Sequence, residues 1–264
     1  MSSPSSGAGV EEEELSKQLQ SVSVSESVSA SPSPSLSSAL SSAPSVVRLV
    51  LDVGFGWPTQ KKPRKERINA VARQLVNYCK SGASDDASKL LVVGQAPELD
   101  PLRLRFTQLM EKADEPRLLE VVDFEVGDCF EMFGGGGGVG GAGYLSPDSE
   151  TTLDVGSAPP PVLIVGALVD RSVTVGRSKR RASSNNCQSA QLPLELTRLE
   201  GLANSEPCNI DTILEICSGW AAKWNKEGGK DKGEDRNRKC FVDAAVSALL
   251  RHEERHPNRT LHME

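Results

Sequence analysis

The sequence lacks closely spaced cysteine pairs. It has six cysteines, but none of them forms a C-x-x-C pair and the gaps between neighbours are wide. Wide spacing argues against a disulfide scaffold or a zinc ribbon and is typical of reduced thiols in an intracellular protein. The cysteines are Cys79, Cys129, Cys187, Cys208, Cys217 and Cys240.

Long apolar segments are also missing. The longest apolar run, from Val162 to Val169, is far too short to cross a bilayer. The N-terminal region has no apolar core of the kind that a secretory signal needs, and it contains Glu11 to Glu14, whereas transit peptides avoid acidic residues. We therefore expect a protein of the nucleus or cytoplasm with no membrane partner, which leaves an organelle open.

The chain has no strong excess of one charge. Its net charge is −6, with one Lys and five Glu in residues 1–46 and 16 Lys and Arg against 14 Asp and Glu in residues 162–264. A polyanionic partner should therefore contact the C-terminal half, through local basic patches.

The composition changes along the chain and predicts its domain organisation. Residues 1–45 contain 18 Ser and too little apolar bulk to fold, so we expect an acidic, Ser-rich disordered segment. Residues 46–256 are expected to form one domain, which contains a flexible Gly-rich loop at 134–143 and a charged linker at 226–239, and residues 257–264 a tail. The Gly-rich loop is not a phosphate-binding loop, because neither Gly-Lys-Ser/Thr nor a helix follows it directly.

Apolar runs alternate with helix-like patterns through the expected domain. We expect an N-cap at Asp100 with Pro101 in the first helical position, and a final helix that turns Phe241, Ala245, Leu249 and Leu250 inward. Alternating strands and helices predict an α/β fold with a mostly parallel sheet. The expected strands are 46–55, 89–96, 118–126, 162–170 and a short extended piece at 190–196, and the expected helices are 65–82, 100–113, 209–224 and 240–256.

The C-terminal sequence HEERHPNRTLH resembles a zinc-protease signature. His252 and His256 lie at i and i+4 with Glu253 between them, and His262 has the spacing of a third ligand. However, Arg259 stands where that signature needs a turn glycine, and no Met-turn follows. We therefore expect no metal there, and interpret the segment as the cationic end of a helix.

The segment from Val162 to Ala182 is more informative. A fully apolar strand runs to Gly166 and is followed by Asp170 and Arg171, which places a carboxylate where α/β folds bind ligands. The basic helix start that follows suits a phosphate backbone, but a surface Asp-Arg pair before a solvated basic helix would look the same. Its basic residues are Arg177, Lys179, Arg180 and Arg181.

Four motifs in order resemble one family. GYLSPDS, LIVGALVDRSVTVGRSKRRA, AQLPLEL and NIDTILEIC resemble the motifs of the tRNA (guanine-N1)-methyltransferases that act at tRNA position 9, within the SPOUT superfamily. The resemblance covers about residues 46–250. It implies a SPOUT-type sheet with helices on both faces, a deep C-terminal trefoil knot, S-adenosylmethionine as cofactor, tRNA but not DNA as partner, and a monomer.

The resemblance also implies roles for individual residues. Asp170 matches the proposed general base, which would take the N1 proton of guanine. Arg171, Arg177, Lys179, Arg180 and Arg181 would bind RNA. Leu145, Gly166, Asp170, Arg171, Ser172, Val173, Thr174, Ser178, Leu192, Pro207, Cys208 and Asn209 would bind the cofactor.

Three positions depart from the family pattern, and alternatives stay open. Ala167 replaces a Gly, Ser172 replaces an Asn, and Asp211 replaces the Asn of the last motif. Adenine at position 9 is an alternative substrate. From another class, a catalytically weak or inactive RNA-binding subunit of a tRNA-processing complex is the alternative function, since a fold does not guarantee turnover.

Overall fold

The computed structural model describes residues 47–82, 89–133, 141–169, 175–200, 208–227, 233–256 and 262–263. The expected Ser-rich segment at 1–45 and most of the Gly-rich loop lie outside these residues.

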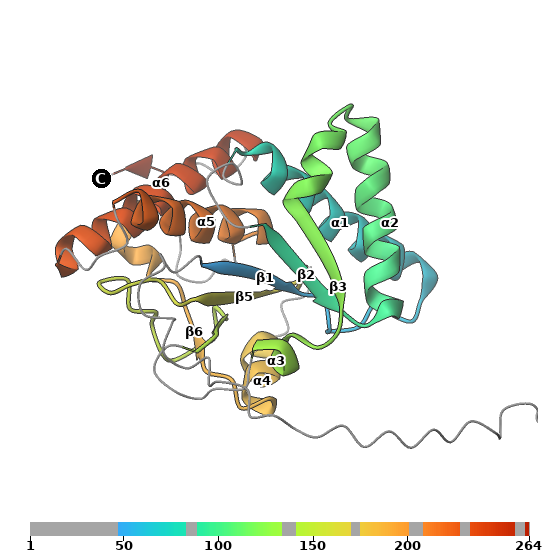
Figure 1. Cartoon of the computed structure of the whole chain (residues 1–264), viewed down its shortest axis with the longest axis horizontal. Helices are drawn as coiled ribbons and strands as arrows, with labels where there is room; N and C mark the ends of the chain where they lie inside the picture. The colour runs from blue at the N-terminus through green and yellow to red at the C-terminus, as the bar shows by residue number, and fades with distance from the viewer. Residues whose placement is uncertain are drawn as a thin grey trace, which may run out of the picture. The chain divides into compact units, whose positions relative to one another are not determined.

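A six-stranded sheet forms the centre of the described part of the chain, and all of its strand pairings are parallel (Figure 1). The strand order is β3-β2-β1-β5-β4-β6, so the predicted α/β fold with a mostly parallel sheet is confirmed. The strands are β1 (Arg48–Asp52), β2 (Leu90–Gly94), β3 (Val122–Val126), β4 (Gly143–Leu145), β5 (Val162–Gly166) and β6 (Ser189–Ala190), and a separate antiparallel pair joins β7 (Leu199–Glu200) to β8 (His262–Met263).

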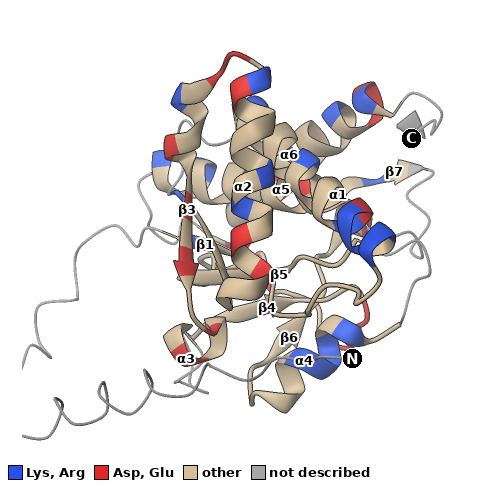
Figure 2. Ribbon diagram, turned by 90° about the vertical axis from the view of Figure 1, so that its right-hand side faces the viewer, with Lys and Arg blue, Asp and Glu red and all other residues tan. Residues whose placement is uncertain are grey.

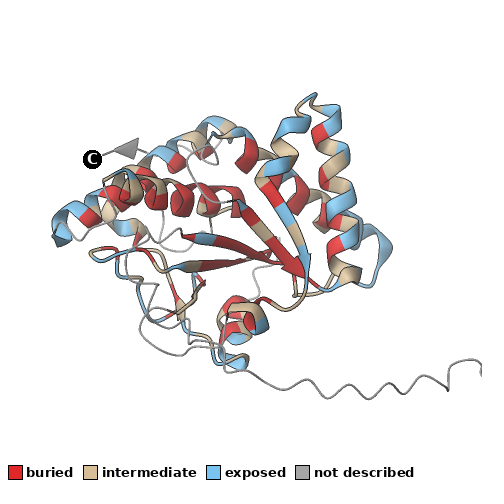
Figure 3. Ribbon diagram, in the orientation of Figure 1, coloured by how far each residue is buried: buried red, intermediate tan, exposed pale blue. Residues whose placement is uncertain are grey.

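Helices cover both faces of this sheet. The central strands β1 and β5 are mostly buried and are drawn mostly red in Figure 3. Alternate residues of β1 lie on opposite faces, so Leu49 and Leu51 join the larger apolar cluster while Val50 joins the smaller one. One face carries α1 (Lys61–Lys80), α2 (Ala96–Lys112), α5 (Ile210–Lys226) and α6 (Glu234–Arg255), and the other carries α3 (Cys129–Phe133) and α4 (Arg177–Ser184) (Figure 1). No described helix is long and apolar enough to span a bilayer.

The strand order reverses at the centre of the sheet. From β1 the chain continues through α1 to β2 on one side, whereas from β5 it continues through α4 to β6 on the other side. Strands β1 and β5 are neighbours, and Asp52 pairs in register with Gly166 at their carboxyl ends. Open α/β sheets bind ligands at such a reversal, just beyond the carboxyl ends of the strands.

Helix α2 begins five residues earlier than predicted, at Ala96 and not at Pro101. Its N-cap is Gln95, not Asp100, and Pro101 lies inside the helix. Pro101 has no N–H to donate to the carbonyl of Pro97, and that carbonyl instead accepts a hydrogen bond from Arg64 at 3.4 Å. The contact with α1 therefore compensates a proline that the sequence pattern places at a helix start.

Three further elements differ from the prediction. Residues 116–121 form a 3-10 helix before β3, and Leu194–Thr197 forms another where an extended piece was expected. Helix α6 begins at Glu234, inside the expected linker, because acidic residues in its first turn and i, i+4 ion pairs such as Lys239–Asp243 stabilise it. Leu250 is 40% exposed and was wrongly predicted to face inward.

Candidate functional site

A buried carboxylate lies at the centre of the reversal. Asp52 is the last residue of β1 and is 1% exposed. One of its oxygens accepts hydrogen bonds from the Gly54 N–H at 2.8 Å and from Arg181 Nη2 at 3.0 Å, and the other accepts from the Tyr144 hydroxyl at 2.9 Å and from Arg181 Nε at 2.5 Å. The desolvated charge is therefore fully paired, as a buried carboxylate requires.

Arg181, on α4, forms an ion pair with Asp52. Its side chain is 20% exposed, and its guanidinium lies 5.2 Å from the ring centroids of both Phe55 and Phe130. Burial alone would lower the pKa of this guanidinium, but the hydrogen bond and negative charge of Asp52 outweigh burial and raise it. Arg181 was expected to bind RNA. The structure pairs its guanidinium with Asp52, because Arg181 lies on the side of α4 that faces the end of β1, and its role toward RNA stays a prediction.

The packing around the Asp52–Arg181 pair also explains why residue 166 is a glycine. A Cβ on Gly166 would lie 2.9 Å from the Phe55 ring and 3.0 Å from the Tyr144 hydroxyl, which is closer than real Cβ contacts. Any larger residue would therefore push apart the groups that hold Asp52. The physical reason for this glycine in the apolar strand is close side-chain packing.

The remaining basic residues of α4 are more accessible. Lys179 makes an ion pair with exposed Glu150 at 2.7 Å and lowers the pKa of that carboxyl through its hydrogen bond and charge. Arg180 is exposed and donates to the carbonyl of Val175 at 3.0 Å, and Arg177 stacks over Phe55. Together they give α4 a cationic surface (Figure 2).

Asp148 anchors the start of α4. Its carboxylate accepts a hydrogen bond at 2.7 Å from the N–H of Gly176, which has φ +77° and is the residue before the helix. In the same region the hydroxyls of Ser146 and Ser178 are 2.7 Å apart. Ser178, an expected cofactor residue, is thereby held against the end of β4.

On the other face of the sheet, the residues near the carboxyl ends of β4 and β5 are apolar. Leu145 and Ala167 are buried in the larger apolar cluster, and Val169 and Leu192 pack against that cluster while remaining partly exposed. The departure at Ala167 places an extra methyl group in this core. Cys208 and Asn209 precede α5, and the departure at Asp211 is fully buried in its first turn, where Asn77 donates to its carboxylate at 3.0 Å.

Some expected site residues lie outside the described part of the chain. These are Asp170, Arg171, Ser172, Val173, Thr174 and Pro207. The loops that contain them join β5 to α4 and β7 to α5, so the expected trefoil knot stays a prediction.

Sequence reasoning missed Asp52, Tyr144 and Asp148 as site residues. Asp52 carried a usable signal, because a carboxylate at the carboxyl end of a buried strand lies at the ligand-binding edge of a parallel sheet. Tyr144 and Asp148 both lie within the motif GYLSPDS, but nothing local indicates which side chains they contact.

The histidine signature at the C-terminus is part of a helix contact. His252 is 7% exposed and its Nδ1 lies 2.9 Å from the Thr212 hydroxyl. His256, one turn later, is exposed, and its ring centroid is 4.6 Å from that of His252. Among the residues that the structure describes, no group of three or more His, Cys, Asp or Glu side chains could hold a metal ion.

No family model and no curated protein matches the sequence. Among solved structures, the spTrm10–SAH complex matches with a TM-score of 0.52 at 19% identity, over 76% of this chain and 96% of that one. The chain shares the fold of spTrm10. A second structure of spTrm10 matches with the same TM-score at 20% identity, over 76% of this chain and 95% of that one, and a dual-specific Trm10 from Thermococcus kodakaraensis matches with a TM-score of 0.48 at 17% identity, over 76% and 99%.

Proposed function

We propose that this protein is an S-adenosylmethionine-dependent tRNA methyltransferase that modifies N1 of guanine at position 9, with adenine as the alternative base. The observation that supports the proposal is the chain reversal at β1 and β5 in a Trm10-like sheet. Leu145 and Gly166, two of the expected cofactor residues, end β4 and β5 there, and Ser178 contacts Ser146 just after β4. The SAH bound to spTrm10 supports the cofactor class.

Two apolar side chains near the carboxyl ends of the strands suit an adenosine-containing cofactor. Val169 and Leu192 are partly exposed and would offer apolar contact for a purine. Asn209, partly exposed just before α5, would add a polar group. When bound, S-adenosylmethionine would supply an electrophilic methyl group carried on a sulfonium sulfur. The sulfur would keep the electron pair of the broken C–S bond and leave as a neutral thioether.

Asp170 is the proposed general base. Guanine N1 carries a proton and is a weak nucleophile until that proton leaves. The Asp170 carboxylate accepts the proton as N1 bonds to the methyl carbon, and the electron pair of the N–H bond stays on the ring. In the sequence, Asp170 follows Val169 directly, four residues after β5 ends at Gly166. Holding both reactants beside it would supply much of the rate.

Two groups of cations are available for tRNA phosphates. The first residues of α1 include Lys61, Lys62 and Lys65, all exposed, with no acidic residue in the first turn (Figure 2). Cations at the positive end of a helix are unfavourable for the helix itself, so this cluster has a cost that binding an anion would offset. Arg177 and Arg180 of α4 form the second group.

The direct test is methyl transfer from labelled S-adenosylmethionine to unmodified tRNAs that carry G or A at position 9. Nuclease digestion and mass spectrometry should find the label on N1 of that base only. If the protein binds tRNA but transfers no methyl group to either substrate, the enzyme proposal is wrong and the alternative function, an inactive RNA-binding subunit, is favoured.

Neutralising the α1 cluster should weaken tRNA binding. Changing Lys61, Lys62 and Lys65 to Gln should reduce the slope of log Kd against log salt by about 2 to 3, since each lost phosphate contact removes about one released counterion. The measurement is a filter-binding series in salt. Arg103, Lys112 and Arg117, exposed on or just after α2, provide a matched triple Gln control that should leave the slope unchanged; equal slopes for the two triple variants would exclude α1 from the RNA interface.

A further inference from the structure

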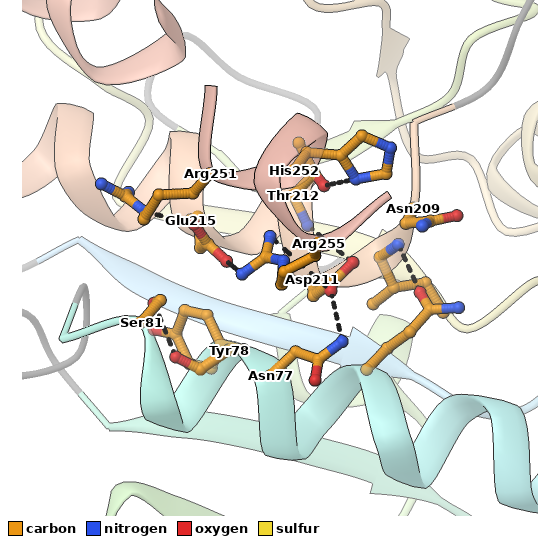
Figure 4. Close-up of polar contacts among 12 residues, drawn as sticks. Asn77, Tyr78, Ser81, Asn209, Asp211, Thr212, Glu215, Arg251, His252 and Arg255 are labelled. Carbon is orange, nitrogen blue, oxygen red and sulfur yellow. Dashed lines mark hydrogen bonds and ion pairs between the residues drawn. The ribbon is translucent and has the colours of Figure 1, made fainter. Parts of the chain in front are cut away.

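The first turn of α5 is held from outside at every residue. Asn209 to Thr212 follow directly on the expected cofactor residues Pro207 and Cys208. Figure 4 shows Asn77 of α1 in contact with Asp211 and His252 of α6 in contact with Thr212. Gln74 of α1 contacts Ile210, and His256, just after α6, contacts Asn209. Helix packing through apolar side chains alone would not need polar contacts at four consecutive positions.

Helix α1 supplies contacts on one side of the turn. The side-chain oxygen of Gln74 accepts a hydrogen bond from the N–H of Ile210 at 2.6 Å. Asn77 donates to the carboxylate of Asp211 at 3.0 Å. These contacts satisfy one free N–H of the helix start and one buried charge.

Helix α6 supplies the contacts on the other side, and they come from the segment with the protease-like signature. His252 Nδ1 lies 2.9 Å from the hydroxyl of Thr212, and His256 Nε2 lies 3.4 Å from the amide nitrogen of Asn209. The intervening Arg255 lies on the same side, with Nη2 3.8 Å from the Asp211 carboxylate.

A buried charge fixes the register between the two helices. Glu215, one turn into α5, is fully buried and accepts hydrogen bonds from Arg255 at 2.6 Å and from Arg251 at 2.8 Å. Buried ion pairs add little stability compared with apolar packing, but their geometry allows one helix register. Sliding α6 along α5 would leave the Glu215 carboxylate unpaired.

We propose that the last turn of α6, together with His256 just after it, positions the expected cofactor residues Cys208 and Asn209. His252, Arg255 and His256 fix the first turn of α5, and Cys208 and Asn209 take their position from this turn. The side chains that imitate a zinc site thus act as positioning residues through Thr212 and Asn209. The proposal rests on the proposed function only for the identity of the ligand.

The test compares two variants that remove contacts to the first turn of α5 with a third variant that removes a contact between α5 and α6 one turn further along. Thr212→Val removes the hydroxyl that meets His252 and keeps the side-chain shape, and His256→Ala removes an exposed ring, so both should fold. Arg251→Gln is the matched control: it removes the hydrogen bond to Glu215 at 2.8 Å, while Arg255, at 2.6 Å, still pairs that carboxylate and keeps the helix register.

Titration calorimetry with SAH and urea unfolding are measured on the full chain. Thr212→Val should weaken SAH binding about 5- to 10-fold and His256→Ala about 2- to 5-fold, as expected for the loss of one hydrogen bond each. Arg251→Gln should lower the urea midpoint at least as much as Thr212→Val and leave the Kd for SAH within about 2-fold. A proportional change of Kd and midpoint in all three variants would show ordinary packing and overturn the proposal.

A second readout separates this proposal from the proposed function. Cys208 directly precedes the turn, so its alkylation rate relative to Cys187 reports the loop without any ligand. The ratio should rise about 3-fold or more in Thr212→Val, because the turn opens more often, and stay constant in Arg251→Gln. If wild type binds no SAH but this ratio changes as expected, the cofactor class is wrong and the positioning role stands; an unchanged ratio overturns that role.

Discussion

Replacing Asp52 with alanine is expected to lower the free energy of unfolding by about 3 to 5 kcal/mol, the usual cost of removing one partner of a buried ion pair. Arg181 would keep its charge, because a guanidinium stays protonated, but it would lose both carboxylate hydrogen bonds at a side chain only 20% exposed. The Tyr144 hydroxyl would lose its acceptor as well.

Urea unfolding at neutral pH measures this loss. Asp128→Ala is the matched control: its carboxylate is 3.8 Å from the same guanidinium, its side chain is 30% exposed, and it accepts a hydrogen bond from the Phe130 N–H at 2.8 Å. The loss of this exposed pair and of the contact at the start of α3 should stay below about 2 kcal/mol. The double variant Asp52→Leu with Arg181→Met should recover most of the stability, since apolar replacements remove both charges together. A loss for Asp52→Ala no larger than the control's would contradict the role of the pair.

The sheet could be predicted because its signals are local. The run RLVLD is apolar enough to indicate a buried strand, and the alternation of such runs with helical patterns indicates parallel pairing. Helix α1 turns Ile68, Val71 and Leu75 inward, and these are buried as their spacing predicts.

Contacts between distant segments could not be predicted in this way. Asp52 and Arg181 are 129 residues apart in the sequence, so composition alone could not distinguish a buried arginine from the exposed Arg180 beside it. The start of α2 was predicted wrongly for the same reason. The carbonyl that Pro101 leaves without a helical donor is bonded by Arg64 of α1, and this contact between two helices cannot be read from the local sequence. The motif resemblance assigned Leu145, Gly166 and Ser178 to one cofactor site, but the contacts that each of them makes could be seen only in the structure.

Asp170→Asn is expected to reduce methyl transfer to guanine about 100- to 10,000-fold, which is the usual contribution of a positioned general base. An amide keeps nearly the same shape but cannot accept the N1 proton. Binding of SAH and tRNA should therefore change far less than the rate, even though Asp170 is also an expected cofactor residue. Asp123→Asn makes the same chemical change on exposed β3, at the far edge of the sheet, and should leave the rate within about 2-fold of wild type.

Two measurements distinguish the loss of a general base from a disturbed site: the dependence of the rate on pH, and the rates on guanine compared with adenine. Without Asp170, solvent must remove the N1 proton, so the rate of the variant on guanine should rise about tenfold for each pH unit, while wild type should rise less steeply. Adenine N1 has a free lone pair and no proton to lose, so the same substitution should cost less than about 10-fold on a tRNA with A at position 9. A disturbed cofactor or tRNA position would instead slow both bases equally and leave the pH profile unchanged. Equal losses on both bases would therefore remove the general-base role from Asp170 while leaving the methyltransferase proposal intact.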